Sequence, residues 1–275
     1  MNRLFSAGVA VATGIALLFL LLPIVAIFAR VPPGDLVSAL GRGQATDALV
    51  VSLQTNLIAL ALIVLAGTPT AWLIATRAGR LRDVAVTLVE LPLVLPPAVA
   101  GIGLLAAFGR VGLVGGHIHI IGTSLAFTKA AVVVAIVFVA SPFYIRSAIA
   151  AFEGLDPAMT QAARTLGAGP GRTFFRVALP LAVGGLGAGA ALAFARGIGE
   201  FGATLMFAGS LRGVTQTLPL AIYEAFDLDF DLALAISAEL VAISAVILLT
   251  TKLIFRWRST SPSTTLFAPS VPRSA

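Results

Sequence analysis

The sequence predicts an all-α polytopic membrane protein with six transmembrane helices. Three observations support this class: 59% of the 275 residues are hydrophobic, only 11% are charged, and the apolar residues lie in long runs. Soluble domains carry about 25% charged residues. A helix crosses the hydrocarbon core in about 20 mostly apolar residues, because all its backbone hydrogen bonds are made internally.

Six segments meet this requirement. The first is longer than the roughly 7 to 15 apolar residues of a signal peptide, so we expect an uncleaved span. The third carries Pro92, Pro96 and Pro97, which remove backbone donors and must break or kink it. The fifth is rich in glycine, and Gly185 and Gly189 have the spacing for close helix approach. The expected spans are 4–29, 48–76, 84–109, 121–145, 177–207 and 232–253.

The basic residues predict the orientation, because Lys and Arg in short loops are held on the cytoplasmic side. Five fall on one side of the expected bundle, namely Arg30, Arg42, Arg110, Lys129 and Arg212. Twelve fall on the other, namely Arg3, Arg77, Arg80, Arg82, Arg146, Arg164, Arg172, Arg176, Lys252, Arg256, Arg258 and Arg273. Both termini are therefore expected in the cytoplasm.

The chain is expected to form one domain. Residues 1–258 form the membrane domain, with a cytoplasmic loop at 152–178, and residues 259–275 are rich in Ser, Thr and Pro and are expected to be a disordered tail. No segment leaves room for a separate catalytic domain, and there is no GxxxxGK[ST] motif to cradle ATP phosphates. We therefore expect a protein that is not an enzyme.

The loop at 152–178 predicts a short exposed helix. Asp156 and Pro157 are typical of a helix start. Gly167 and the Gly and Pro residues that follow it are typical of a helix end. Apolar residues recur between them at helical spacing, which predicts a small apolar surface facing the cytoplasm. They are Ala158, Met159, Ala162, Ala163 and Leu166.

The spacing of this loop resembles that of a known motif. Gln161-Ala162-Ala163, three residues, Gly167, nine residues and Val177-Ala178-Leu179-Pro180 resemble the EAA loop of ABC importer permeases. The resemblance implies the type I importer permease fold. It also implies that Gln161, Ala162, Ala163, Gly167, Leu179 and Pro180 belong to a coupling element that docks on an ATPase subunit. Gln161 stands where the family usually has Glu. The alternative is a helical hairpin that packs on its own bundle.

Residues 193–204 resemble the fifth-span motif of molybdate-type and sulfate-type permeases, and residues 93–97 and 215–223 resemble the molybdate branch more than the sulfate branch. The resemblance implies import of molybdate or tungstate across a bacterial or archaeal inner membrane. The implied partners are a second copy of the chain, two ATPase subunits that bind ATP and Mg, an extracytoplasmic oxyanion-binding protein and membrane lipid, with no nucleic acid. No cofactor is expected on this chain. A sulfate or thiosulfate permease and a secondary transporter remain alternatives.

Charged residues inside the spans are candidates for the pathway. Arg196 and Glu200 lie four apart on one helix face, and an unpaired charge at mid-bilayer would cost about 2.5 to 3.5 kcal/mol. With Thr204, Pro96 and Pro97 they are expected to line the translocation path or its gate. The alternative is a buried structural pair.

The remaining polar residues are given structural roles. Glu90 and Glu239 are expected to be satisfied within the bundle. His117 and His119 could share a metal, but no nearby carboxylate or Cys completes a ligand set, so no metal site is expected.

Overall fold

The described part of the protein is built from helices. The computed structural model describes residues 3–32, 34, 41, 43–115 and 125–259, and these ranges contain no strand. The helices named below are α1 (Arg3–Arg30), α3 (Gly43–Ala75), α4 (Arg80–Val94), α5 (Pro97–Phe108), α7 (Lys129–Glu153), α8 (Pro157–Thr165), α9 (Pro170–Thr173), η2 (Phe174–Ala178), α10 (Leu179–Ile198), α11 (Gly202–Ala208), α12 (Leu218–Leu228) and α13 (Phe230–Ser259).

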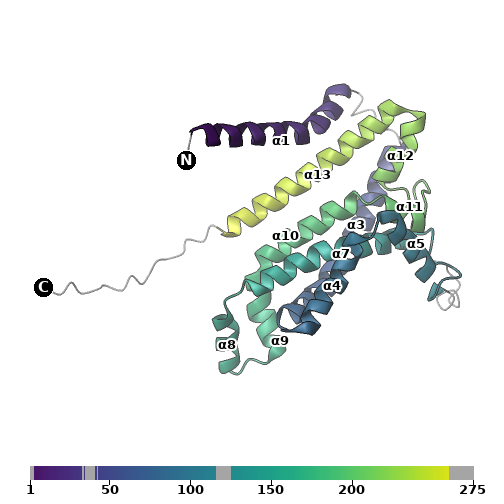
Figure 1. Ribbon diagram of the computed structural model, residues 1–275. Coiled ribbons are helices and arrows are strands. Elements are labelled where there is room, and N and C mark those ends of the chain that lie inside the picture. The colour runs from purple at the N-terminus through teal and green to yellow at the C-terminus, as the bar shows by residue number, and fades with distance from the viewer. Residues whose placement is uncertain (1–2, 33, 35–40, 42, 116–124, 260–275) are drawn as a thin grey trace.

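Helices α3, α7 and α10 pack together as the core of the bundle (Figure 1). Small residues allow the close approach: Gly67 of α3 lies against the ring of Tyr144 of α7, where a side chain on Gly67 would have no room. The Tyr144 hydroxyl is fully buried and shares a hydrogen bond of 2.6 Å with the Thr68 hydroxyl. This satisfies the one polar atom that the ring brings into the apolar core.

Helix α10 approaches α7 through Gly185 and Gly189, as the sequence predicted. A Cβ atom on Gly185 would overlap the Cβ of Ala151, and one on Gly189 would lie 2.8 Å from the Cβ of Ser147. The Ser147 hydroxyl donates a hydrogen bond of 3.2 Å to the Gly185 carbonyl oxygen. Small residues and a polar contact are the interactions by which helices associate in a bilayer.

Five of the described helical segments are long and apolar enough to cross a membrane, and a bent helix pair makes a sixth if it counts as one span. The prediction of an all-α membrane protein with up to six spans is therefore confirmed. The first span, α1, stands apart from the core in Figure 1 and has no buried residue in its apolar window. It approaches α13 at its end, where Val31 packs with Ala235.

The third expected span, 84–109, is not one helix. It is divided into α4 and α5, whose axes differ by 109°. Leu95 and Pro96 between them are extended, with ψ angles of 130° and 136°. A proline disfavours the helical conformation of the residue before it, so Pro96 and Pro97 account for the break. The prediction that the prolines break or kink this span is confirmed, and the break divides it into two helices.

The fifth expected span, 177–207, is also wrong as one helix. Helix α10 ends at Ile198, three residues form a break, and the short helix α11 follows. The expected outer loop that follows contains α12, which was not predicted. The fourth span was expected from residue 121, whereas α7 begins at Lys129 with the Thr128 side chain accepting a hydrogen bond from the Ala131 N–H. Residues 121–124 lie outside the described residues.

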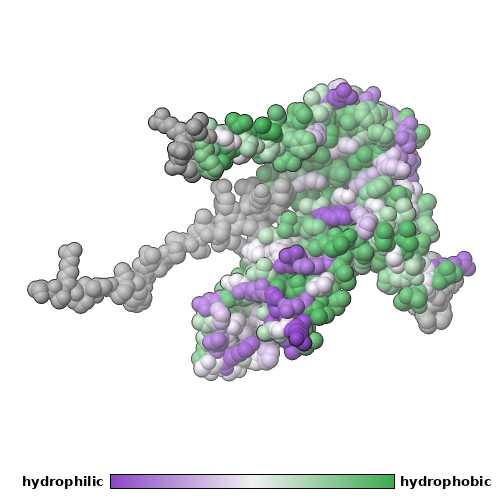
Figure 2. Space-filling view, viewed as in Figure 1, coloured by the Kyte–Doolittle hydropathy of each residue, from purple (hydrophilic) through white to green (hydrophobic). Residues whose placement is uncertain are grey.

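Different helices lie at the two ends of the bundle. In Figure 1 the start of α1, the end of α13 and the α8–α9 hairpin lie toward one end, and α12 lies toward the other. Hydrophilic residues gather over α8, α9 and the start of α4 (Figure 2). The loop 152–178 thus holds α8, α9 and η2 at the polar end. Apart from Ser259, which ends α13, the expected tail 259–275 lies outside the described residues.

Candidate functional site

Two helix breaks lie side by side in the bundle. Helix α5 follows the first break and packs against α11, which follows the second. The contact requires glycine on both sides: a Cβ on Gly202 would lie 2.7 Å from the Cβ of Pro97, and one on Gly101 would lie 2.7 Å from the Ala203 carbonyl oxygen. Broken helices inside a membrane are tolerated where they face protein or water, as at transport sites.

Arg196 and Glu200 form an ion pair at the second break. The Nη2 atom of Arg196 lies 2.6 Å from Oε2 of Glu200, whose side chain is 1% exposed, whereas that of Arg196 is 28% exposed. The other carboxylate oxygen accepts a hydrogen bond of 2.8 Å from the Ala203 N–H in the first turn of α11. Glu200 thus neutralises Arg196 and also holds the start of α11, so each carboxylate oxygen has a partner.

A cavity opens beside this pair, and Arg196 brings a charge into it. Its other walls are apolar and come from the end of α4, the first break, α5 and α7: Pro92, Leu93, Leu95, Pro97, Ala100, Val139 and Phe143. A guanidinium in an apolar surround attracts anions more strongly than one in water, because the effective dielectric constant is lower. The structure therefore brings Arg196 together with Pro97 at one cavity.

The other pathway candidates have different positions. Pro96 lies in the break as the N-terminal cap of α5. It is not among the residues that line the cavity. Thr204 is fully buried in α11, and its hydroxyl has no hydrogen-bond partner among the described residues. A role for Asn56 of α3 was not predicted. Its Nδ2 donates a hydrogen bond of 3.0 Å to the Phe194 carbonyl oxygen. Asn56 ties the end of α10 to α3.

Glu90 and Glu239, the two acids expected to have structural roles, differ in their polar partners. Glu90 of α4 forms an ion pair of 3.2 Å with Arg146 of α7. Glu239 of α13 is buried, and its carboxylate oxygens have no hydrogen-bond partner among the described residues. His117 and His119 lie outside the described residues, within which no cluster of potential metal ligands occurs.

The exposed helix in the loop 152–178 is α8. The Asp156 side chain accepts a hydrogen bond of 2.9 Å from the Ala158 N–H, and Pro157 occupies the first turn, as predicted. None of the residues of α8 is buried against the described part of the chain. Met159 is 49% exposed, and Leu166, just beyond the helix, is 87% exposed. The small apolar surface is therefore uncovered.

Three of the motif residues lie in α8, and two of them are exposed. Gln161 and Ala162 are exposed, and Ala163 is half-buried. Gly167 ends the helix with a φ of +80°, a conformation that side chains other than glycine rarely adopt. No described atom lies within 4 Å of the position that a Cβ on Gly167 would occupy. The backbone at Gly167 is thus open to approach from outside.

The last two motif residues lie at the start of α10, behind a π-helical turn. Leu179 is half-buried, Pro180 is exposed, and the Leu179 N–H donates to the carbonyl oxygen of Phe174, five residues earlier. Phe174 packs with Trp72 of α3 at a ring-centroid distance of 5.6 Å and with Phe152 of α7 at 6.2 Å. This aromatic cluster attaches the α8–α9 hairpin to the core, and nothing in the sequence pattern indicated it.

The sequence matches the model of a known protein family over residues 63–259. This range includes both helix breaks and α8. The description of the family is binding-protein-dependent transport system inner membrane component. The chain belongs to this family. It is therefore a multi-pass membrane component of a transport system, and the permease identity that the EAA-like loop predicted is confirmed.

Two relatives align with most of this chain. The chain is 44% identical over 233 residues to "Molybdenum transport system permease protein ModB" of Mycobacterium tuberculosis, covering 85% of this chain and 88% of the relative. It is 36% identical over 245 residues to "Probable transport system permease protein NifC" of Clostridium pasteurianum, covering 89% and 86%.

Solved structures share the fold of this chain. A bacterial alginate ABC transporter, in complex with alginate pentasaccharide-bound periplasmic protein, contains a chain with a TM-score of 0.74 at 17% identity, covering 94% of this chain and 95% of that one. The MetNI methionine ABC transporter in inward-facing conformations gives a TM-score of 0.63 at 21% identity, covering 78% and 95%. The type I importer permease fold is therefore confirmed.

Proposed function

We propose that this chain is the permease subunit of an ATP-driven importer that carries a tetrahedral oxyanion, molybdate or tungstate, by alternating access. The relatives named for molybdenum transport support the substrate, and the similarity to them spans most of the chain. The observation that carries the ATP-driven part is α8, an exposed helix with an uncovered apolar surface at the polar end of the bundle.

Helix α8 is the coupling element. An amphipathic helix that no described part of its own chain covers fits a groove on a partner subunit. The partner is an ABC ATPase that binds ATP and Mg, whereas this chain binds no cofactor and catalyses no reaction. Gln161 can still form hydrogen bonds where the family usually has Glu, and the open backbone at Gly167 permits close contact.

Arg196 is the anion-attracting residue of the pathway. It lines the cavity at the break of the third span, where the other walls are apolar. Because Arg196 is already paired with Glu200, an oxyanion would meet guanidinium N–H donors in a site of no net charge and would not be trapped there. Binding that is weak enough for release is required at any transport site. The Arg196–Glu200 pair thus lines the pathway and is also a buried structural pair, the two alternatives that the sequence left open.

The complete importer contains further subunits. Two copies of the chain form the pathway, and α4 and α5 carry large exposed apolar residues that a second copy or lipid would cover: Leu88 is 59%, Val94 is 81% and Ile102 is 56% exposed. Two ATPases bind on the side of α8, and an extracytoplasmic oxyanion-binding protein delivers the substrate on the opposite side. The chain lies in the plasma membrane with both termini in the cytoplasm, in contact with lipid.

Uptake into proteoliposomes tests this function. The chain is reconstituted with its ATPase and binding protein, and labelled molybdate is supplied outside with ATP inside. We expect uptake that requires ATP hydrolysis and is competed by tungstate more strongly than by sulfate. Stronger competition by sulfate would make the chain a sulfate or thiosulfate permease. Uptake driven by an ion gradient without ATP would make it a secondary transporter and contradict the proposal.

A further inference from the structure

Helix α4 is held on the bundle differently from the core helices. None of its residues is buried in the described structure. Its apolar contact with the core comes from partly buried side chains, Ala85, Val86 and Val89. Yet α4 carries the break of the third span, because Leu95 follows it directly. Its position relative to α7 therefore decides where the cavity wall stands.

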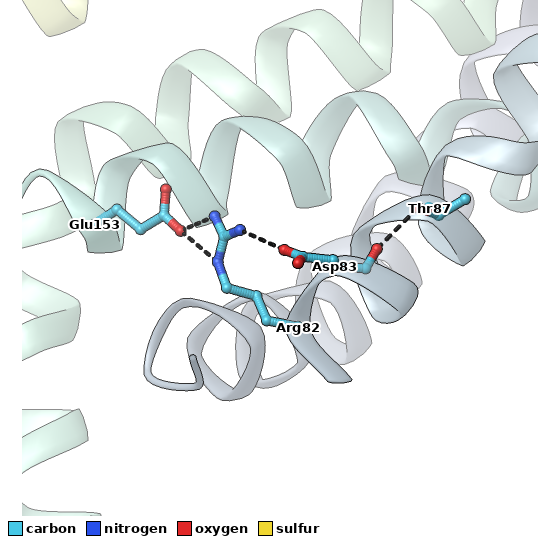
Figure 3. A network of polar contacts seen from close by, with 4 residues as sticks. All are labelled: Arg82, Asp83, Thr87 and Glu153. Carbon is cyan, nitrogen blue, oxygen red and sulfur yellow. Dashed lines mark hydrogen bonds and ion pairs between the residues drawn. The ribbon is translucent and has the colours of Figure 1, made fainter. Parts of the chain in front are cut away.

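Two ion pairs join α4 to α7 in the described structure. At the start of α4, Arg82 donates from Nε to a carboxylate oxygen of Glu153 at 3.1 Å and also pairs with it through Nη2. Asp83 lies 3.5 Å from the same guanidinium, so Arg82 sits between two carboxylates (Figure 3). Farther along, Glu90 pairs with Arg146 at 3.2 Å.

The two pairs lie along one helix contact in antiparallel order. Arg82 and Glu90 are eight residues apart in α4, or about 12 Å, and Glu153 and Arg146 are seven apart in α7, or about 10.5 Å. The charges alternate, because α4 supplies a cation and then an anion, and α7 the reverse. A shift of α4 along α7 would break both pairs, so the arrangement fixes one register.

Glu153 also connects this contact to α8. It is the last residue of α7, and three residues separate it from the start of α8 at Pro157. A displacement of α8 therefore reaches Glu153 directly, and Glu153 passes it to Arg82. The side chains of Arg82 and Glu153 are 31% and 38% exposed, so the pair contributes little to folding stability. Its effect is on position.

We infer that these ion pairs make α4 move together with the end of α7, so that movement of α8 becomes movement of the break at Leu95 and Pro96. Arg82, Glu153, Glu90 and Arg146 are positioning residues, and none of them lines the cavity at Arg196. The inference rests on the proposed function, because it concerns the same coupling.

Charge reversal tests the inference in the reconstituted importer. Uptake of molybdate and ATP hydrolysis are measured in the same vesicles. Arg82→Glu and Glu153→Arg are each expected to lower uptake per ATP about fivefold, the factor that corresponds to one exposed ion pair. The double variant restores it to within about twofold of the wild type, since the pair re-forms with opposite polarity. ATP hydrolysis and the thermal midpoint stay unchanged.

Arg80→Glu is the matched control, because Arg80 lies in the same turn of α4 without an ion pair to a described residue. It is expected to leave uptake per ATP unchanged. Single reversals that transport like the wild type, or a double variant no better than the singles, would overturn the inference. A wild-type complex without ATP-dependent uptake would instead overturn the proposed function, and this inference with it.

A covalent tie tests the same point by rescue. The chain has no cysteine, so Arg82→Cys with Glu153→Cys introduces the only two thiols. Uptake per ATP is expected to fall as in the single reversals and to return when a short bifunctional thiol reagent joins the two helices. Cross-linking that abolishes the remaining uptake would show that α4 must move relative to α7, and the inference would be wrong.

Discussion

Helices α7 and α8 are three residues apart in the chain and are built in opposite ways. Helix α7 has buried residues along most of its length, among them Val132, Ile136 and Tyr144, whereas α8 has none in the described structure. Burial of apolar surface is the main favourable term in folding. Helix α7 therefore completes its packing within the chain, whereas the apolar residues of α8 are covered by no described part of it, as the proposed contact with an ATPase requires.

The same difference separates stability from coupling. A change in the α3, α7 and α10 core should lower the amount and stability of the protein, because its helices have no room for extra atoms. A change in α8 should leave the fold intact and weaken the contact with the ATPase.

Arg196→Met should have the largest effect on stability. It leaves the Glu200 carboxylate buried without its cation, and loss of one partner of a buried pair costs about 3 to 5 kcal/mol. We expect a lower thermal midpoint and less folded protein in detergent. Glu200→Gln is the control, because its amide can keep the hydrogen bond from the Ala203 N–H. Equal stability of the Arg196→Met variant and the wild type would contradict the buried pair.

Gly185→Ala should destabilise the core by about 1 to 3 kcal/mol, the usual effect of excess volume. The added methyl group would overlap the Ala151 Cβ, which belongs to α7 and cannot rotate away. The neighbouring Gly184→Ala is the matched control, because no described atom lies within 4 Å of its Cβ position. The two thermal midpoints are compared, and a fall for both or for neither would refute tight packing of α10 on α7.

Gly167→Asn should leave stability nearly unchanged and lower the affinity for the ATPase about tenfold, or about 1.4 kcal/mol. Asparagine tolerates the positive φ of this position, so the end of α8 is kept while the open space is filled. The affinity is measured by titrating ATPase into the purified permease. An unchanged affinity would mean that glycine is needed at this position for the backbone alone.

Leu166→Ala should have the smallest effect, about fivefold on the same affinity or about 1 kcal/mol. Leu166 is 87% exposed, so its truncation removes contact with a partner and no packing within the chain. The thermal midpoint of the permease alone should not change. A fall in that midpoint without a change in affinity would place Leu166 in the fold and not in the interface.

The spans and the start of α8 could be predicted because their causes are local. Long apolar runs give membrane helices, and Asp156 followed by Pro157 gives a helix start whatever the rest of the chain does. The prolines of the third span likewise predicted a break. Its angle of 109° could not be predicted, because it depends on where α5 packs against α11 through Gly101 and Gly202.

Other parts of the site depend on residues far apart in the chain. Arg82 and Arg146 were expected in cytoplasmic loops and Glu90 in the bundle interior, and no role was predicted for Glu153. Their pairing across 71 residues, in the case of Arg82 and Glu153, appears only once α4 lies on α7. The break before α11 was missed because Gly199 and Gly202 are common residues in membrane helices, where glycine alone does not indicate an end.

Site-specific cross-linking tests most directly whether α8 is the contact with the ATPase. Ala162→Cys gives the chain a single thiol on an exposed face of α8. In membranes that hold the assembled importer, a short heterobifunctional reagent on this thiol should capture the ATPase subunit, and the bound ATPase should protect the thiol from reagents added on the cytoplasmic side. Labelling of the introduced thiol from the opposite side of the membrane, or no capture from an intact complex, would contradict the account.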